Sequence, residues 1–267
     1  MHDSDSIACR LCASRAPGAR VGAYLRCADC GCFYLVETPP GPSNARFEGG
    51  SAAHCEAADL ARVGYFERRL AQALCHVPGG AVGRLVDVGC GAGILLGLAA
   101  DKGWQVAGIE LSSDLAARVR ARVPSAQVMI GDATAIRQWP WPGQAEVVVL
   151  LDVIEHVADP GALLARCRAG LRRGGTLLLQ TPNARSLRAR RQGARWPMLD
   201  PEQHLVLFSP RELRRALEGA GFAVLDCRTV SGTGTETGAA RLVAATKERL
   251  LAAAGLGNGL LAIGRAR

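Results

Sequence analysis

The chain has 267 residues, 49% hydrophobic and 21% charged, which is close to a globular average and excludes a wholly disordered protein. No apolar run reaches the about 20 residues that span a bilayer, and the N-terminus opens with acidic and polar residues instead of a signal-peptide pattern. We therefore expect a soluble, cytoplasmic chain. The net charge of +8 is almost entirely arginine, because Lys102 and Lys247 are the two lysines. A global charge of this kind bears on solubility and not on fold or activity.

Four of the ten cysteines form two close pairs near the N-terminus, Cys9-x-x-Cys12 and Cys27-x-x-Cys30. Each pair can present two thiolates from one tight turn, and two facing turns make a tetrahedral site. The spacing predicts a structural Zn²⁺ bound by Cys9, Cys12, Cys27 and Cys30. Cys32 could replace Cys30 as a ligand, and the alternative is two unrelated thiol pairs.

The first segments divide at proline-rich and glycine-rich breaks. Residues 1–38 are predicted to form a zinc ribbon, with short strands near 21–26 and 32–37. Residues 39–80 follow as a linker and helical segment, in which a helix is expected from about 57 to 75, before Pro78-Gly79-Gly80. A ribbon of this size is too small for its own core, so the metal would supply most of its folding free energy.

Residues 81–267 are predicted to be the main domain, in which strands and helices alternate. Strands are expected at 84–88, 105–109, 127–130, 145–151 and 176–180, and helices at 92–102, 113–123 and 160–171. The alternation predicts an α/β fold with a doubly wound parallel sheet. Residues 172–175, Arg-Arg-Gly-Gly, are expected to turn the chain into the fifth of these strands.

The last part of the chain also carries helix and strand signals. Ser209, Pro210 and Glu212 have the residue types of a helix N-cap, first position and N3 position. This helix should end at 219–221 and lead to a strand at 222–229. A polar loop at 231–238, a helix from about 236 to 254 and a last strand at 260–264 complete the prediction.

Ligands of such a sheet bind at the carboxyl ends of its strands. The first strand runs into Gly89, Gly91 and Gly93, which allow a tight turn and a close backbone approach to a ligand. A dinucleotide fingerprint would need glycine at position 94, which is Ile94 here. Asp87, two residues before the first glycine, suits a cation better than a pyrophosphate. S-adenosylmethionine (SAM) carries both a sulfonium and an ammonium group.

Two more acidic residues follow successive strands. Glu110 ends the second strand, about 20 residues further on, where it could accept hydrogen bonds from both ribose hydroxyls of SAM. Asp132 follows the third strand and could accept from the adenine amine. Three acids at three successive strand ends behind a triple-glycine turn predict a SAM site.

The sequence resembles the class I SAM-dependent methyltransferases, in the branch with an N-terminal four-cysteine zinc ribbon. DVGCGAG (87–93) matches the first family motif, LLDVIEHVADP (150–160) the fourth-strand motif and LRRGGTLLLQTPN (171–183) the fifth-strand motif; residues 196–222 are similar to the segment that follows. The resemblance implies a Rossmann-like seven-stranded sheet with an antiparallel last strand, and it implies that Asp152 faces the methionine part of SAM. The insert helix at about 236–254 departs from the family, where a hairpin joins the last two strands.

Transfer to a hydroxyl requires that a proton be removed, and two histidines are candidate bases. His156 follows the fourth strand, and His204 lies on a loop after residues 200–203. We predict His156 as the base because it lies on the more rigid element. The alternative for either residue is a histidine that is held by a carbonyl or caps a helix.

The acceptor is predicted to be a hydroxyl of a small molecule or glycan, either a sugar or a phenol. The alternative is an RNA methyltransferase that grips RNA with its ribbon and arginine segment, and a lesser alternative is a non-catalytic adaptor. The fourth strand leads to DVIE and not to the [DN]PP[YF] turn that holds a base amine, and aromatic residues make up only 4% of the chain. An arginine-rich segment, either a solvated helix face or a grip for an anionic acceptor, contains Arg185, Arg188, Arg190, Arg191 and Arg195.

Overall fold

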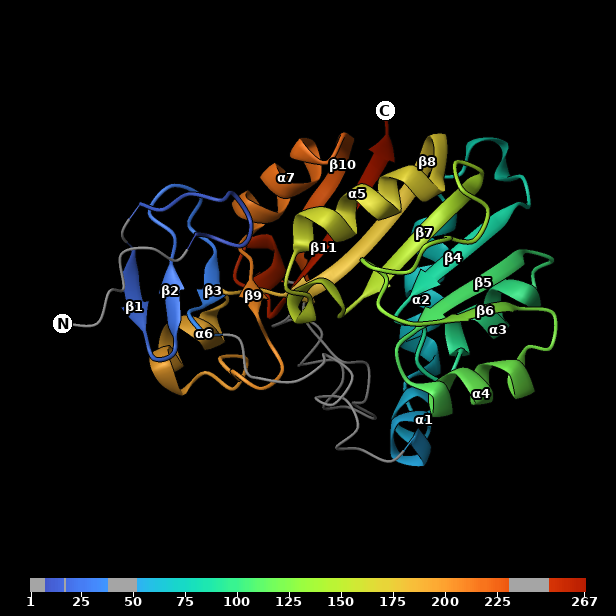
Figure 1. The fold of residues 1–267 in the computed structure, drawn as a ribbon, viewed down its shortest axis with the longest axis horizontal. Helices are drawn as coiled ribbons and strands as arrows, with labels where there is room; N and C mark the ends of the chain where they lie inside the picture. The colour runs from blue at the N-terminus through green and yellow to red at the C-terminus, as the bar shows by residue number, and fades with distance from the viewer. Residues whose placement is uncertain (1–7, 17, 38–51, 231–249) are drawn as a thin grey trace.

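A computed structural model describes residues 8–16, 18–37, 52–230 and 250–267, and these form a large sheet, a small sheet and the helices around them (Figure 1). The large sheet has seven strands in the order β10-β11-β8-β7-β4-β5-β6. Its strands are β4 (Arg84–Val88), β5 (Gln105–Glu110), β6 (Gln127–Ile130), β7 (Ala145–Leu151), β8 (Leu171–Pro182), β10 (Phe222–Val230) and β11 (Gly259–Ala266). β11 pairs antiparallel with both β8 and β10. The predicted doubly wound sheet with an antiparallel last strand is confirmed.

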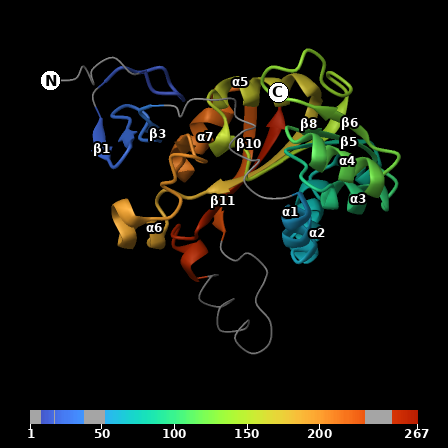
Figure 2. The ribbon, with the colours of Figure 1, turned by 60° about the horizontal axis from the view of Figure 1, so that its bottom comes forward.

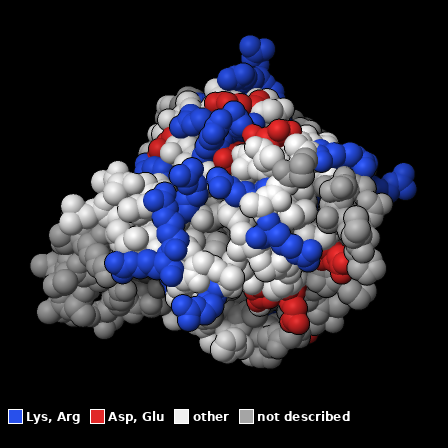
Figure 3. All heavy atoms as spheres, turned by 90° about the vertical axis from the view of Figure 1, so that its left-hand side faces the viewer, with Lys and Arg blue, Asp and Glu red and all other residues white. Residues whose placement is uncertain are grey.

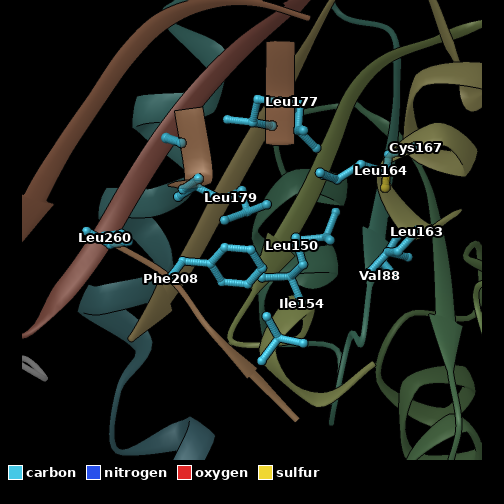
Figure 4. Packing of buried hydrophobic residues seen from close by; sticks show 14 of the residues in the cluster. Val88, Leu150, Ile154, Leu163, Leu164, Cys167, Leu177, Leu179, Phe208 and Leu260 are labelled. Carbon is cyan, nitrogen blue, oxygen red and sulfur yellow. The ribbon is translucent and has the colours of Figure 1, made fainter. Parts of the chain in front are cut away.

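Helices cover both faces of this sheet because its strands are apolar on both sides. Along β4, Leu85 packs in one cluster with side chains of α2 (Val63–Leu74), α3 (Ile94–Ala100) and α4 (Ser113–Arg122). Val86 and Val88 point to the opposite face and belong to a second cluster, which includes side chains of α5 (Pro160–Gly170) and α7 (Pro210–Gly219). Figure 4 shows that second cluster closely, with Leu150 of β7 and Leu163 of α5 among its members. Successive strand residues point to opposite faces, so each strand contributes to both cores.

The helical segment before the sheet differs from its prediction. One helix was expected from about 57 to 75, whereas the structure has α1 (Ala52–Leu60) and α2, separated at Arg62, whose backbone is non-helical (φ −114°, ψ 18°). Figure 2 shows α1 and α2 together on one side of the sheet. The break lets α1 leave the line of α2, so that Asp59 reaches the glycine turn described below.

The Arg-Arg-Gly-Gly segment forms a bulge at the start of β8. Ala145 pairs with Leu171 and Val147 pairs with Thr176, so β8 advances five residues while β7 advances two. Gly174 has φ +77°, which favours glycine, and the chain loops out there before pairing resumes.

The ribbon and the large domain share a sheet. Its strands are β1 (Ala19–Val21), β2 (Tyr24–Arg26), β3 (Phe33–Leu35) and β9 (Val206–Leu207), in that order. Phe33 pairs with Leu207 and Tyr34 with Val206, so the two-residue β9 extends the ribbon sheet from within the large domain. Tyr24 and Leu35 of the ribbon belong to the same buried cluster as Val88 and Leu164. The ribbon therefore has no core separate from that of the large domain.

The remaining helical elements named for the described residues are short. They are η3 (Pro78–Gly80), η4 (Ile154–His156), α6 (Leu187–Gln192) and η5 (Gly193–Arg195). The predicted capping box of α7 is present, with Glu212 accepting from the backbone N–H of Ser209 at 3.1 Å. Of the predicted insert helix, residues 236–249 lie outside the described residues, and residues 250–253 are helical. In the part of the chain that the structure describes, no helix is long and apolar enough to cross a membrane.

Candidate functional site

A glycine turn joins the end of β4 to α3 and is enclosed from two sides. Gly89 has φ +70°, and a Cβ atom there would lie 2.5 Å from Cγ2 of Val153, which follows β7. Gly91 has φ +53°, and its Cβ would lie 3.0 Å from a carboxylate oxygen of Asp59. Backbone conformation and space therefore both require glycine at these positions. The turn leads into α3, whose N-terminus can accept an anionic group such as the carboxylate of SAM.

Glu110 fixes the shape of this turn. Its Oε2 accepts from the backbone N–H of Gly91 at 2.8 Å, and its Oε1 accepts from Leu111 and Ser112 at 2.8 and 3.0 Å. Each carboxylate oxygen has two lone pairs, so Oε2 can accept one more hydrogen bond. This capacity fits a contact with one ribose hydroxyl, whereas the sequence predicts contacts with both.

Three carboxylates gather around the turn: Asp87, Glu110 and Asp59. Asp87 and Glu110 are 4% and 8% exposed, whereas Asp59 is half-buried. Burial raises the pKa of Asp87 well above its usual value, and the neighbouring Glu110 and Asp59 raise it further. Burial also raises the pKa of Glu110 and of Asp59. Like charges enclosed together favour a cation between them, so these residues fit the ammonium and sulfonium groups of SAM.

Asp132 lies beyond β6, where its carboxylate accepts from the backbone N–H and the hydroxyl of Thr134 at 2.8 and 2.7 Å. It thus shapes its own turn, and its contact with adenine stays a prediction. Trp139, on the same loop, is buried and donates from Nε1 to the carbonyl of Ala133 at 3.0 Å.

Asp152 directly follows β7 and has a left-handed backbone conformation, φ +55°. Its carboxylate accepts from Nε2 of Gln180 at 3.3 Å, and Oε1 of Gln180 accepts from Nε of Arg69 at 2.6 Å. Arg69 and Gln180 are buried, while Asp152 is exposed. This chain of hydrogen bonds connects α2, β8 and β7 at the carboxyl edge of the sheet. A non-glycine residue with positive φ is costly, and such residues cluster at functional sites.

The structure brings His156 and His204 together, with ring centroids 4.9 Å apart. Nδ1 of His156 donates to the carbonyl of Gln203 at 2.8 Å, and Nδ1 of His204 donates to the carbonyl of Met198 at 2.9 Å. Since a carbonyl only accepts, each ring carries its proton on Nδ1 when neutral and its lone pair on Nε2. Oε1 of Glu155 lies 4.0 Å from Nε2 of His156.

Burial shifts the pKa values of His156, His204 and Glu155 so that their neutral forms are favoured. It lowers the pKa of His156 to about 4 and that of His204 below its usual value. Burial, and then the neighbouring Asp152, raise the pKa of Glu155 well above its usual value. A proton acceptor with a pKa of about 4 gains little by taking a proton at neutral pH. His156 alone would therefore be a weak base at neutral pH. It lies directly beyond the end of β7, and His204 packs beside it.

The four predicted zinc ligands face one another in the ribbon. The Sγ atoms of Cys9, Cys12, Cys27 and Cys30 all lie within 4.8 Å of one another. The Cys9–Cys30 and Cys12–Cys27 Sγ distances are 3.6 and 3.7 Å. Four sulfurs at about 2.3 Å from a tetrahedral Zn²⁺ lie about 3.8 Å apart, so this geometry could hold a zinc ion. Cys32 Sγ lies 3.3 Å from both Cys9 and Cys30, so it remains a possible substitute ligand.

The arginine-rich segment lies beside the ribbon, on α6, η5 and the turn before them, and all five of its arginines are exposed. Figure 3 shows basic side chains gathered on the face that carries the ribbon. A cavity of about 300 Å³ between the ribbon and α6 is lined by Arg26, Arg185 and Arg190, together with Trp196. A second, of about 470 Å³, lies between the cysteine turns and helices α5 and α7. Neither cavity is at the glycine turn.

Sequence reasoning missed Asp59, Arg69 and Gln180. Gln180 had a local signal, because it is a polar residue at the end of the apolar run Leu177–Leu179. Asp59 had none, since its approach to the turn depends on how α1 packs against the domain.

The seven-stranded sheet described here is also the fold of a solved SAM-dependent methyltransferase of Archaeoglobus fulgidus, which has a TM-score of 0.56 at 19% identity and covers 76% of this chain and 94% of its own. The chain belongs to the methyltransferase domain family, whose model matches residues 62–226, more than half of its length.

Relatives of known name agree with this assignment. A ubiquinone biosynthesis O-methyltransferase of Rhodopseudomonas palustris is 32% identical over 150 residues, which cover 54% of this chain and 59% of the relative. A probable SAM-dependent methyltransferase of Mycolicibacterium smegmatis is 33% identical over 171 residues, 62% of this chain and 63% of the relative. The chain thus spans about three-fifths of the length of these relatives.

Solved structures share the fold. A chain from the complex between the Trm112 methyltransferase activator and a methyltransferase of Haloferax volcanii has a TM-score of 0.63 at 18% identity, covering 84% of this chain and 97% of its own. A SAM-dependent methyltransferase of Thermotoga maritima has a TM-score of 0.59 at 19% identity, with coverages of 85% and 100%. At these identities the likeness concerns the fold alone.

Proposed function

We propose that this methyltransferase acts on a hydroxyl of a small molecule, with a phenol or a sugar as the acceptor class. The observation that carries the proposal is the position of the Glu155, His156 and His204 side chains, directly beyond the end of β7 and beside Asp152. An acceptor hydroxyl there would meet groups able to polarise it. The names of several relatives, which are O-methyltransferases of ubiquinone biosynthesis, support the same acceptor chemistry.

We assign the cofactor to the glycine-turn edge of the sheet. When bound, SAM supplies an electrophilic methyl group on a positively charged sulfur. Asp87 and Asp59 would stabilise its positive charges, Glu110 would accept from one of its ribose hydroxyls and Asp132 from its adenine amine. Gly89 and Gly91 leave room for the close approach, and Asp152, held by Gln180, would face the methionine part.

This chain's main contribution to the reaction is to orient the acceptor and to remove water from it. The chain turns after β7 and continues into η4, and the loop that carries His204 covers this turn. Leu205, next to His204, donates its backbone N–H to the carbonyl of Glu155 at 2.7 Å. That loop and η4 together would place the acceptor hydroxyl against the histidine pair. The exposed Arg185 and Arg190 could bind an anionic part of the acceptor from the neighbouring cavity.

The test is a transfer assay with SAM carrying a labelled methyl group. The purified chain is offered phenols, nucleotide sugars and total RNA in parallel, and an Asp87→Asn variant serves as the control for cofactor-dependent transfer. Label in phenols or sugars supports the proposal. Label in RNA alone would replace it with the RNA methyltransferase alternative.

A further inference from the structure

The side chains beyond the end of β7 have the composition of a metal site as well as of an acid–base site. Glu155 contributes a carboxylate oxygen, and His156 and His204 each contribute an imidazole nitrogen; all three atoms lie within 4.8 Å of one another. The residues come from two separate segments, η4 and the loop before β9, which the fold brings together. We propose that Glu155, His156 and His204 bind a divalent transition-metal cation, a second metal distinct from the zinc of the ribbon.

The hydrogen bonds around the two rings are those of metal-binding histidines. Such a histidine usually donates its second ring N–H to a carbonyl or carboxylate, which fixes the tautomer and the ring orientation. His156 and His204 donate from Nδ1 to the carbonyls of Gln203 and Met198. Both lone pairs are therefore on Nε2, the atom of His156 that lies 4.0 Å from Oε1 of Glu155.

A hydrogen bond also orients the carboxylate of Glu155 toward the two histidines. Its Oε2 accepts from the hydroxyl of Thr181 at 2.9 Å, which leaves Oε1 on the side of the histidines. The side chain is 1% exposed, yet no lysine or arginine in the described part of the chain forms an ion pair with it. A buried carboxylate without a cationic partner is costly, and a bound cation would compensate it.

The distances between the three ligand atoms fit a site whose ligands move closer together when the cation binds. Nitrogen and oxygen ligands about 2.1 Å from a cation lie about 3.0–3.4 Å from one another, so each atom would need to move by roughly 1 Å or less. Two imidazoles and one carboxylate favour zinc, iron or cobalt over magnesium, which prefers oxygen ligands. Three protein ligands leave coordination positions open, as in catalytic sites and unlike the four-thiolate ribbon.

The role of this metal site rests on the proposed function, because the cation would act on the acceptor hydroxyl. A cation here would bind the acceptor hydroxyl and lower its pKa, so that the proton is lost to water. The two histidines would then act as ligands and not as bases.

The experiment measures metal binding directly. Protein purified with its ribbon zinc, at one zinc per chain by elemental analysis, is titrated with Zn²⁺ in a calorimeter. We expect one further Zn²⁺ to bind per chain. Removing a partner outside the coordination sphere typically costs about 10–100-fold in metal affinity, so Glu155→Gln and His204→Ala should each cost more than about 100-fold and Thr181→Val about tenfold.

The matched control is His76→Ala, a histidine beyond the end of α2 that is not part of the cluster. It should bind the further Zn²⁺ like the wild type. Glu155→Gln keeps the shape of the side chain and an acceptor for Thr181, so a folded variant remains available for the comparison. Each variant must retain its ribbon zinc.

The outcomes separate this site from the proposed function. A wild type that binds no further Zn²⁺, or one whose binding is unchanged in both Glu155→Gln and His204→Ala, overturns the metal site. Because no acceptor is present in the titration, the failure of every hydroxyl acceptor in the transfer assay would overturn the proposed function alone.

Discussion

At the scale of single residues, Glu110 has two roles that mutation can separate. Glu110→Ala removes its three backbone hydrogen bonds and the proposed ribose contact, so we expect SAM affinity to fall by roughly 2–4 kcal/mol and thermal stability to fall with it. Glu110→Gln keeps one acceptor oxygen but can turn an amide donor toward Gly91, so it should weaken both properties less. Calorimetry with SAM and a melting curve measure the two. Unchanged affinity in a folded Glu110→Ala protein would remove Glu110 from the cofactor site.

The raised pKa of Asp87 makes cofactor affinity depend on pH. SAM is positively charged at its sulfonium and ammonium groups, so it should bind the ionised carboxylate better than the protonated one. Affinity should therefore increase as pH rises through the raised pKa of Asp87, and below that pKa binding should release protons. The groups that face Asp87 are the carboxylates of Glu110 and Asp59 and the thiol of Cys90.

Titrations with SAM in buffers of different ionisation enthalpy count the released protons, and Asp87→Asn should release fewer. The same group also affects stability. A carboxyl whose pKa is raised on folding binds more protons in the folded state, so its contribution to stability is lost as pH rises from its unfolded to its folded pKa. Affinity that is flat with pH in the wild type would show that Asp87 does not interact with the charge of SAM.

At the scale of elements, the ribbon holds the loop that carries His204. The hydroxyl of Tyr24 in β2 donates to the carbonyl of His204 at 2.7 Å, and Leu35 donates to the carbonyl of Leu205 at 2.9 Å. Burial raises the pKa of Tyr24, so its hydroxyl stays a donor. We expect Tyr24→Phe to lower kcat for the acceptor by roughly tenfold, because a small misplacement of a reacting group is costly.

SAM affinity and zinc content should not change in Tyr24→Phe, which distinguishes a positioning role from a loss of fold. Arg20→Ala is the control, because Arg20 is an exposed ribbon residue on β1, two strands away from β3. A kcat equal to that of the wild type in Tyr24→Phe would mean that the backbone pairing of β3 with β9 is sufficient.

The cysteine cluster allows a further test at this scale. Cys9→Ser should lose the zinc, since Cys9 is one of the four thiols that lie within 4.8 Å of one another. Cys32→Ser should keep one zinc per chain if Cys30 is the fourth ligand. Elemental analysis of both variants, purified under reducing conditions, decides between the two ligand sets. Loss of zinc in Cys32→Ser with retention in Cys30→Ser would assign the position to Cys32.

At the scale of the whole molecule, ribbon and sheet should unfold together. One buried cluster contains Tyr24 and Leu35 of the ribbon as well as Val88 and Leu164 of the large domain. Removing the zinc should therefore lower the melting temperature of the entire chain, by roughly 2–4 °C for each kcal/mol of lost stability. Calorimetry of the zinc-loaded and zinc-free protein should show one transition in each case. An unchanged main transition would mean that the ribbon unfolds independently.

Local signals in the sequence were sufficient for most of the fold and for the cofactor edge. Apolar runs bounded by glycine and proline located β6 and β7 to the residue, and the capping residues located the start of α7. Asp87, Glu110 and Asp132 could be placed at strand ends because the carboxyl ends of parallel strands share one edge of the sheet. Each of these inferences depends on residues close together in the chain.

The sequence by itself determined the seven strands of the large sheet in chain order, the glycine turn and the four-cysteine cluster, because chain-local periodicity and spacing specify them. Only the tertiary structure decided that Asp59 reaches the glycine turn, that Glu155 lies buried beside His156 and His204, and that β9 joins the ribbon to the large domain. These contacts connect segments far apart in the chain. Their geometry depends on how the helices and loops pack around the sheet, which neither periodicity nor residue spacing encodes.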